Sequence, residues 1–289
     1  MNRFNEIKNE IETYLDKSIA VKYPSSIYES MRYSVLGGGK RLRGILTVET
    51  GLIYGAKIEE LLPTACAIEM LHSQSLIHDD LPCMDNDDYR RGKLSNHKVY
   101  GESTAVLAGD ALLSYAPKFI IDRTPKSIKA ETILQVLSEF FTAAGVDGII
   151  SGQIVDIDSE NKEIADETLK YIYEYKTTKL FKCAVRSGAI IAGVSCETLE
   201  KLTLFIQYYG EAFQIKDDVL DVTSTREELG KTPNKDINSG KSTYVSKFGI
   251  DAAKNRIIYL CNKAYDILKQ EGIKSDVYEQ IIKKLIVFK

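Results

Sequence analysis

The stretch LIHDDLPCMD, residues 76–85, places three aspartates where an apolar run ends. A second stretch, FQIKDDVLD at residues 213–221, again holds three aspartates among apolar residues. An ionised carboxylate beside apolar side chains is costly unless a cation pairs with it. Carboxylate oxygens suit hard cations such as Mg²⁺. Two such sets facing each other would hold several Mg²⁺ ions and, through them, a diphosphate.

Both stretches fit helices. Asp217 and Asp221 are four residues apart, so on a helix they share a face. In the first stretch, Pro82 forces a helix to end close to Asp79 and before Asp85. Acidic pairs are also common on solvated helix faces, and either stretch alone fits that interpretation equally well. The same arrangement appearing twice favours a binding site.

Outward from these stretches, apolar residues recur at i, i+3 and i+4, which is typical of amphipathic helices. The chain has only six prolines and no linker, repeat or low-complexity tract that would mark a domain boundary. No stretch predicts a strand reliably. We therefore expect one all-α domain over residues 1–289. The expected helices are Glu59–Asp80, Gly101–Tyr115, Ser127–Ala143, Ala165–Val185, Thr198–Leu220 and Ala252–Gln270.

Composition disfavours several classes of protein. With 44% apolar residues and a formal net charge of −3, the chain is typical of soluble globular proteins. Nucleic-acid binding needs a sustained basic face, and a membrane span needs an uncharged apolar run of about 18 residues; we find neither. Five cysteines without CxxC spacing indicate free thiols in a reducing compartment. We expect a cytoplasmic protein with no membrane and no nucleic-acid partner.

Basic motifs accompany the acidic ones. GGGKRLR at residues 37–43 combines a flexible turn, whose backbone N–H groups can approach an anion, with three cations. RRGK follows at 90–93, KT at 176–177, GK at 230–231 and GKST at 240–243. Arginine forks match phosphate oxygens and lysine supplies a point charge. Each motif alone also fits an ordinary exposed basic patch. A P-loop is excluded, since Lys235 stands where its first glycine would be.

Together these motifs resemble the all-trans polyprenyl diphosphate synthases, specifically the short-chain bacterial farnesyl and plant-type geranylgeranyl diphosphate synthases. The resemblance runs from about residue 33 to residue 247. It rests on GGGKRLR, DDxxxxD at 79–85, LAGDALL at 107–113, GQxxD at 152–156, KT, FQxxDDxxD at 213–221, LGK and GKST, in that order. It implies a single helical bundle around a deep central cavity.

The resemblance also implies the chemistry. An allylic diphosphate (dimethylallyl or geranyl) loses its diphosphate, and the double bond of isopentenyl diphosphate attacks the resulting carbocation. Because stabilising the leaving group is the costly part, metals and cations should gather on the allylic diphosphate. We expect about three Mg²⁺ ions, carried by carboxylates. Homodimers are the norm in this family.

Residue roles follow from the matching motif positions. The resemblance assigns Asp79, Asp85 and Asp217 as direct Mg²⁺ ligands. The resemblance gives three possible roles to Asp80, Asp218 and Asp221. They are further Mg²⁺ ligands, ligands that reach the metal through a water molecule, or hydrogen-bond acceptors that hold the direct ligands in place. Arg90, Lys176, Thr177, Gln214 and Lys231 would hold the allylic diphosphate. Lys40, Arg43, His72 and Arg91 would hold isopentenyl diphosphate. The catalytic set is then Asp79, Asp85, Asp217, Lys176 and Arg90.

The histidines need separate treatment. An isopentenyl diphosphate site without a metal must gain its affinity from direct Lys, Arg and His contacts. His72 lies two helical turns before Asp79 on the same face, so it can point into the same cavity. Without the motif context, a satisfied core histidine is the better interpretation of His72. We interpret His78, adjacent to Asp79, as structural, and His97 has no assigned role.

Product length depends on Gln74 and Ser75, which lie a little over one helical turn before the first motif. Relatives that make farnesyl diphosphate usually have an aromatic side chain at the position of Gln74, as a floor for the growing chain. The smaller side chains at these two positions favour a product of twenty carbons, whereas the overall resemblance favours a product of fifteen carbons. We expect farnesyl diphosphate, because the Gln74 amide would be poorly satisfied against a hydrocarbon tail. Geranylgeranyl diphosphate is the alternative.

Other classes fit less well. An HD-type metal phosphohydrolase, prompted by His78-Asp79, needs a metal-ligating histidine well upstream, and His72 is the first histidine in the chain. A terpene cyclase has no need of GGGKRLR, and a catalytically inactive subunit would carry degraded aspartate motifs. The tail KLIVFK at 284–289 lacks the arginine that many relatives carry near the C-terminus. Whether this tail closes the entrance of the active site is therefore left open.

Overall fold

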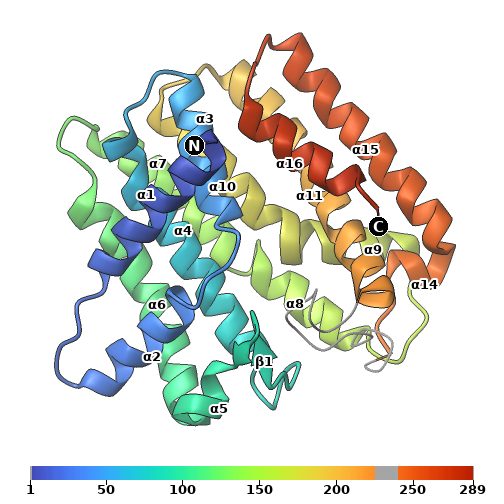
Figure 1. The fold of residues 1–289 in the computed structure, drawn as a ribbon, viewed down its shortest axis with the longest axis horizontal. Coiled ribbons are helices and arrows are strands. Elements are labelled where there is room, and N and C mark those ends of the chain that lie inside the picture. Colours follow the sequence, from blue (N-terminus) through green and yellow to red (C-terminus); the bar gives the residue numbers. More distant parts are fainter. Residues whose placement is uncertain (1, 225–239, 289) are drawn as a thin grey trace.

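The computed structural model describes residues 2–224 and 240–288, and their regular structure is almost entirely helical (Figure 1). The all-α prediction is confirmed. Within the described ranges the strands are β1 (Tyr89–Arg90) and β2 (Lys93–Leu94), a short antiparallel hairpin that the sequence analysis missed. The helices are α1 (Arg3–Ser18), α2 (Ser25–Val35), α3 (Leu42–Ile53), α4 (Ile58–Asp79), α5 (Asn96–Tyr100), α6 (Glu102–Arg123), α7 (Ala130–Ala144), α8 (Ile149–Asp158), α9 (Asp166–Ile172), α10 (Lys179–Ile191), α11 (Cys196–Thr223), α14 (Tyr244–Phe248), α15 (Ile250–Gln270) and α16 (Asp276–Ile286).

Most expected helices agree with these bounds to within a few residues, and two do not. Helix α6 continues past Tyr115 to Arg123 through Pro117, which is buried. The stretch 165–185, expected as one helix, is α9, a π-helical segment η1 (Tyr173–Thr178) and the start of α10. Such π-helical turns are rare and often mark functional sites. The sequence could not reveal the π-helical segment η1, because its apolar residues keep the spacing of an ordinary α-helix.

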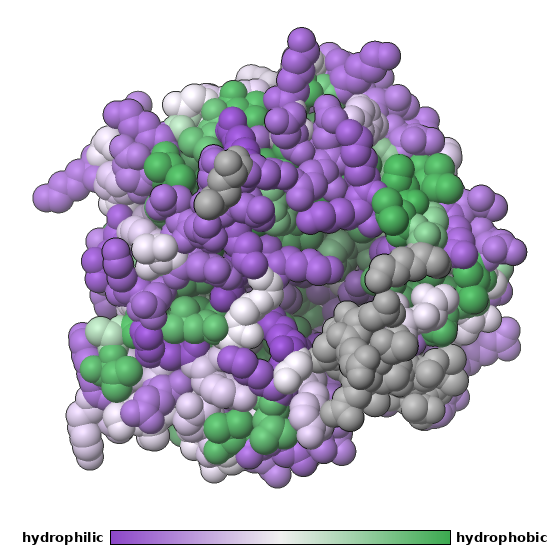
Figure 2. Space-filling model, in the orientation of Figure 1, coloured by the Kyte–Doolittle hydropathy of each residue, from purple (hydrophilic) through white to green (hydrophobic). Residues whose placement is uncertain are grey.

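Helix α4 lies at the centre of the bundle. It packs against α6 on one side and against α3 and α10 on others. Leu61, Ile68 and Leu71, spread along α4, are all fully buried, as expected for a helix surrounded by others. Helices α15 and α16 cover α11 on the other side of the molecule (Figure 1). Figure 2 shows hydrophilic side chains gathered around a hollow near the middle of the face viewed.

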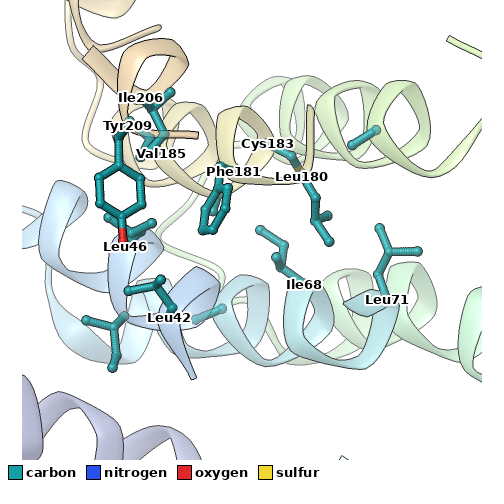
Figure 3. Close-up of a cluster of buried hydrophobic side chains, with 14 of the residues drawn as sticks. Leu42, Leu46, Ile68, Leu71, Leu180, Phe181, Cys183, Val185, Ile206 and Tyr209 are labelled. Atoms are coloured by element: carbon teal, nitrogen blue, oxygen red, sulfur yellow. The ribbon is translucent and has the colours of Figure 1, made fainter. Parts of the chain in front are cut away.

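One layer of the core fixes α4 and α11 across from each other. Leu42, Leu46, Ile68 and Leu71 from α3 and α4 face Leu180, Phe181, Val185, Ile206 and Tyr209 from α10 and α11 (Figure 3). All of these side chains are buried. They belong to a continuous apolar cluster that runs from Phe4 to Leu285. This packing sets the two aspartate stretches, one at the end of α4 and one within α11, on facing walls of a cavity.

Candidate active site

A cavity of about 480 Å³ lies between α4, α8, η1, α11 and the loop before α3. Most of the predicted site residues line it: Lys40, Arg43, His72, Ser75, Asp79, Asp85, Arg90, Arg91, Lys176, Thr177, Gln214, Asp217 and Asp218. Three predicted residues, Gln74, Asp80 and Asp221, are buried but are not among its lining residues. Lys231 lies outside the described residues. A larger groove of about 1160 Å³ between α1, α11 and α16 contains none of the motif aspartates.

The first aspartate motif folds back on itself. Helix α4 ends at Asp79, as Pro82 predicts, and the Asp85 backbone N–H then donates to the Asp79 carbonyl at 2.8 Å. Buried Leu81 anchors the turn. The carboxyls of Asp79 and Asp85 therefore share one wall of the cavity. Burial raises the pKa of Asp79 to about 6, and the charges of Asp85 and Asp80 add to the rise.

Asp80 points away from the cavity and pairs with Arg90. The Arg90 Nε lies 3.0 Å from Asp80 Oδ1, and Nη2 of the same guanidinium makes a second contact with that oxygen. The hairpin β1–β2 holds Arg90 and Arg91 at the cavity edge. Although burial opposes it, the hydrogen bond that Arg90 donates to the Asp80 carboxylate raises the pKa of Arg90. Asp80 thus orients Arg90.

The second motif lies within α11, where Gln214, Asp217 and Asp218 face the cavity. Asp218 is almost fully enclosed by donors: Gln214 Nε2 at 3.2 Å, the backbone N–H of Tyr244 at 2.9 Å, and the Tyr173 hydroxyl. Asp217 remains on the cavity wall. Asp218 therefore joins α11 to Tyr173 and Tyr244 at this wall.

The segment η1 carries Lys176 and Thr177 into the cavity. Thr177 Oγ1 donates to Gln214 Oε1 at 2.6 Å, and Lys176 Nζ lies 2.6 Å from Asp156 Oδ2. Helix α8 can come this close because of Gly152. A Cβ at Gly152 would lie 2.2 Å from the Lys176 backbone nitrogen, closer than any side chain allows.

Two polar residues of this region were quoted in motifs but assigned no role: Asp156 of GQxxD and Lys241 of GKST. Lys241 Nζ lies 3.0 Å from Asp85 Oδ1 and 3.1 Å from Asp156 Oδ2. It therefore links the first aspartate motif to α8. Spacing alone could not reveal this link, because 156 residues separate Lys241 from Asp85.

A second group of lining residues, here called the cationic end, carries positive charge. Arg43 Nη1 lies 3.3 Å from His72 Nε2, and its guanidinium lies 4.4 Å from the centre of the Phe181 ring. Arg91 Nη1 donates to the Gly38 carbonyl at 2.5 Å, which holds the glycine turn in place. Burial, and then the charge of Arg43, lowers the pKa of His72 well below its usual value. His72 is therefore neutral near pH 7.

A buried pair supports this end and was not predicted. Arg41 is 3% exposed, and its Nη1 lies 3.9 Å from Glu69 Oε2. Glu69 Oε1 also accepts from the Gly44 backbone N–H at 2.8 Å, at the start of α3. A glutamate about three turns into an apolar helix is a signal that could have been read from the sequence.

Donor chemistry fits a hard divalent cation. Asp79 and Asp85 on one wall and Asp217 on the other offer carboxylate oxygens, the ligands that Mg²⁺ prefers. Among the described residues, no three His, Cys, Asp or Glu side chains form a closed metal cage by themselves. A metal between these walls would therefore need further oxygen ligands, such as those of a diphosphate.

Gln74 and His78 join α4 to α6 beside the cavity. The Gln74 Nε2 lies 3.1 Å from His78 Nδ1, and His78 Nε2 lies 3.1 Å from the Val106 carbonyl. His78 sits directly over Gly109, where a Cβ would lie 2.0 Å from Nε2. His78 is thus structural, as predicted. The Gln74 amide has a hydrogen-bond partner in His78, which the sequence analysis did not assign.

The likeness to known proteins agrees with this site. Residues 24–285 match the model of the family described as polyprenyl synthetase. The chain is 47% identical over 265 residues to a dimethylallyltranstransferase of Fischerella ambigua, covering 91% of this chain and 75% of that protein. It is 45% identical over 275 residues to a geranylgeranyl diphosphate synthase of Cyanophora paradoxa, covering 91% of each chain. It is 39% identical over 280 residues to a farnesyl diphosphate synthase of Bacillus subtilis, covering 97% of this chain and 94% of that protein.

A solved structure gives the same answer for the fold. A Helicobacter pylori geranyltransferase, described as complexed with magnesium and isoprenyl diphosphate, superposes with a TM-score of 0.86 at 29% identity. The match covers 98% of this chain and 95% of that one. From its motifs, its fold and these relatives, the chain belongs to the polyprenyl synthetase family and is a prenyltransferase of isoprenoid biosynthesis.

Proposed function

We propose that the protein catalyses the Mg²⁺-dependent head-to-tail condensation of isopentenyl diphosphate with dimethylallyl or geranyl diphosphate, giving farnesyl diphosphate. The observation that carries this proposal is one cavity with two chemically different anion-binding ends. One end offers carboxylates and lysines, and the other offers Lys40, Arg43, Arg91 and His72. The diphosphate that leaves the allylic substrate and the diphosphate that stays on isopentenyl diphosphate would each bind at a separate site. The magnesium complex of the Helicobacter pylori relative supports the choice of metal.

At the acidic end, the residues hold the leaving group. Asp79, Asp85 and Asp217 would carry about three Mg²⁺ ions. When bound, these ions would neutralise charge that develops on the departing diphosphate. Lys176 and Arg90 donate further charged hydrogen bonds to the same group. Asp80 and Asp218 keep Arg90 and Gln214 in place from behind.

At the cationic end, the residues hold the second substrate without a metal. Arg43, Lys40 and Arg91 bind the diphosphate of isopentenyl diphosphate directly. His72, neutral in this setting, adds a hydrogen bond without adding charge. This arrangement presents the double bond to the carbocation formed at the other end. The released diphosphate, held beside the reacting carbons, takes the proton that leaves.

The farnesyl product rests on the α4–α6 contact. Gln74 and His78 tie α4 to the Val106 carbonyl of α6, and no residue of α6 is among those that line the cavity. A chain growing from Asp79 toward α6 would have to break this link. Geranylgeranyl diphosphate remains the second candidate, favoured by the 45% identity to the Cyanophora paradoxa enzyme.

We further propose a cytoplasmic homodimer. Two stretches, Glu102–Arg123 and Ala130–Asp158, have the length and hydropathy of membrane spans, but the second is broken between α7 and α8. Large apolar side chains stay exposed along these helices, including Leu107, Leu134 and Phe141 at 58%, 66% and 54%. A second copy of the chain would cover them. Leu107→Glu should then shift the protein to monomers in light scattering, and an unchanged mass would contradict this assignment.

The direct test is product identification. The purified protein is incubated with isopentenyl diphosphate and each allylic diphosphate, with Mg²⁺ or with EDTA, and the products are separated by chain length. We expect elongation only with Mg²⁺, with farnesyl diphosphate as the main product. Hydrolysis without elongation would overturn the proposed reaction. A twenty-carbon main product would overturn only its length.

A further inference from the structure

Arg43 is held in the cationic end by side chains that carry no charge. Its Nη1 lies 3.3 Å from the neutral His72, and its guanidinium carbon lies 4.4 Å from the centre of the Phe181 ring. Its Nε is buried without a hydrogen-bond partner in the part of the chain that the structure describes. Burial lowers the pKa of Arg43, and the charges of Glu69 and Asp217 offset this effect only in part. A guanidinium nevertheless keeps its proton in proteins, so this charge is available to an anion.

Arg90, beside the first aspartate motif, is held in the opposite way. Its guanidinium pairs with the Asp80 carboxylate, and Asp87 lies 3.7 Å from the same nitrogen. Two carboxylates therefore balance the charge of Arg90 by direct contact. The face of an aromatic ring also attracts a cation, through its quadrupole, but it brings no negative charge that an incoming anion would have to displace. A ring can thus hold an arginine in place and leave its charge unspent.

The Phe181 ring is itself fixed by its surroundings. It is fully buried on α10, and the rings of Tyr209 and Phe213 meet it edge to face at centroid distances of 5.6 Å and 5.1 Å. Figure 3 shows it pointing from α10 toward the layer formed by α3 and α4, and α3 carries Arg43. Phe181 is not among the residues that line the cavity. An effect of this ring on a substrate must therefore pass through Arg43.

We infer that Phe181 is a positioning residue, whose ring holds the Arg43 guanidinium by a cation–π contact where the diphosphate of isopentenyl diphosphate binds. Without the attraction of the ring, Arg43 would turn toward Glu69 or Asp217, whose charges already act on it. Such an ion pair would have to break before the diphosphate could bind, which lowers the affinity. This inference rests on the role of Arg43 in the proposed function.

The test weakens the electrostatic attraction of the ring and keeps its shape nearly unchanged. Phe181 is replaced by 4-fluoro-, 3,5-difluoro- and 3,4,5-trifluorophenylalanine, and calorimetry in EDTA measures the affinity for isopentenyl diphosphate. Each fluorine withdraws electron density from the face of the ring. We expect the dissociation constant to rise along the series, to about tenfold for the trifluoro variant. The same series at Phe205, a buried ring that packs against Tyr278, should change the constant by less than about twofold.

Two further measurements separate positioning from core packing. The trifluoro variant at Phe181 should raise the KM for isopentenyl diphosphate and leave kcat and the allylic KM within about twofold. With Arg43→Ala in place, the fluorinated series should no longer change the affinity. A flat series with Arg43 present, or a loss of affinity that persists without Arg43, would overturn the inference. Absence of elongation by the unsubstituted protein would overturn the proposed reaction instead, and the binding series would still decide the role of Phe181.

Discussion

The two ends of the cavity hold anions by opposite means. Around Asp79, Asp85 and Asp217, carboxylates outnumber the lysines that balance them, and burial lifts the pKa of Asp79 to about 6. Around Arg43 and Arg91, cations prevail, and burial lowers the pKa of Arg91 to about 10, with Arg41 adding to the effect. Like charges therefore repel one another at each end of the cavity. In the proposed function, a metal with its diphosphate would balance the charge at one end, and a bare diphosphate would balance it at the other.

This difference matches the fates of the two substrates that we propose. A leaving diphosphate gains charge in the transition state, so stabilisation placed there speeds the reaction. A diphosphate that stays attached needs only to be held, and direct Arg and Lys contacts do this. The contrast between the two ends can be broken or sharpened by substitution.

The largest effect is expected at the acidic end. Asp79→Ala, Asp85→Ala or Asp217→Ala should each lower turnover by about 10²–10³ or more, because each removes a stabiliser of the leaving group. Steady-state kinetics with a thermal melt as a fold check measures this. The exposed Asp88→Ala, a nearby carboxylate paired with Lys98, serves as the control. A near-normal rate for Asp79→Ala would refute the metal assignment.

The next effect separates the ends by kinetics. Arg43→Ala should raise the KM for isopentenyl diphosphate about 10- to 100-fold with little change for the allylic substrate, as expected for one lost charged hydrogen bond. Lys176→Ala should raise the allylic KM instead and lower kcat. Measuring both constants for both variants completes the comparison. Equal damage to both constants by both variants would show that the cations are wrongly divided between the ends.

A smaller change concerns product length. Gln74→Phe should shorten or sharpen the product distribution, because an aromatic ring would form a larger floor. Gln74→Ala should lengthen it, because the side chain and its link to His78 are both lost. Chromatography of the products measures the shift. Ser73→Ala, on the same helix but bonded only to the Glu69 carbonyl, is the control. Identical profiles from both Gln74 variants would show that other helices build the floor.

The smallest effect is on stability. With its folded pKa at about 6, Asp79 keeps a proton that the unfolded chain loses near pH 4. Its contribution is therefore present at low pH and is lost as pH rises toward 6. Asp79→Asn should stabilise the ligand-free protein by about 1–3 kcal/mol at pH 7.5 and by much less at pH 4.5. Denaturant melts at both values measure this, and an equal gain at both would contradict the pKa.

Much of the site could be predicted because its motifs are local. Asp79 and Asp217 are fixed by helix ends and helix faces, and Pro82 marks where α4 stops. The contacts that were missed are non-local. Lys241 reaches Asp85 across 156 residues, and Asp218 meets Tyr244 only after the chain has folded back.

The fold shows the same limit. Long helices follow from apolar spacing, whereas η1 and the hairpin β1–β2 do not. The hairpin is two residues per strand and depends on the ion pair between Arg90 and Asp80 more than on any strand pattern. The pair Gln74–His78, by contrast, is four residues apart on α4, so helix spacing could have predicted it.

In the proposed function, metal serves only one of the two ends of the cavity. Calorimetry with isopentenyl diphosphate and with a non-reactive allylic diphosphate analogue, each in Mg²⁺ and in EDTA, tests it directly. We predict that EDTA weakens binding of the allylic analogue by about 100-fold or more and changes the affinity for isopentenyl diphosphate by less than about twofold. An equal loss of affinity for both ligands in EDTA would contradict the division of the cavity.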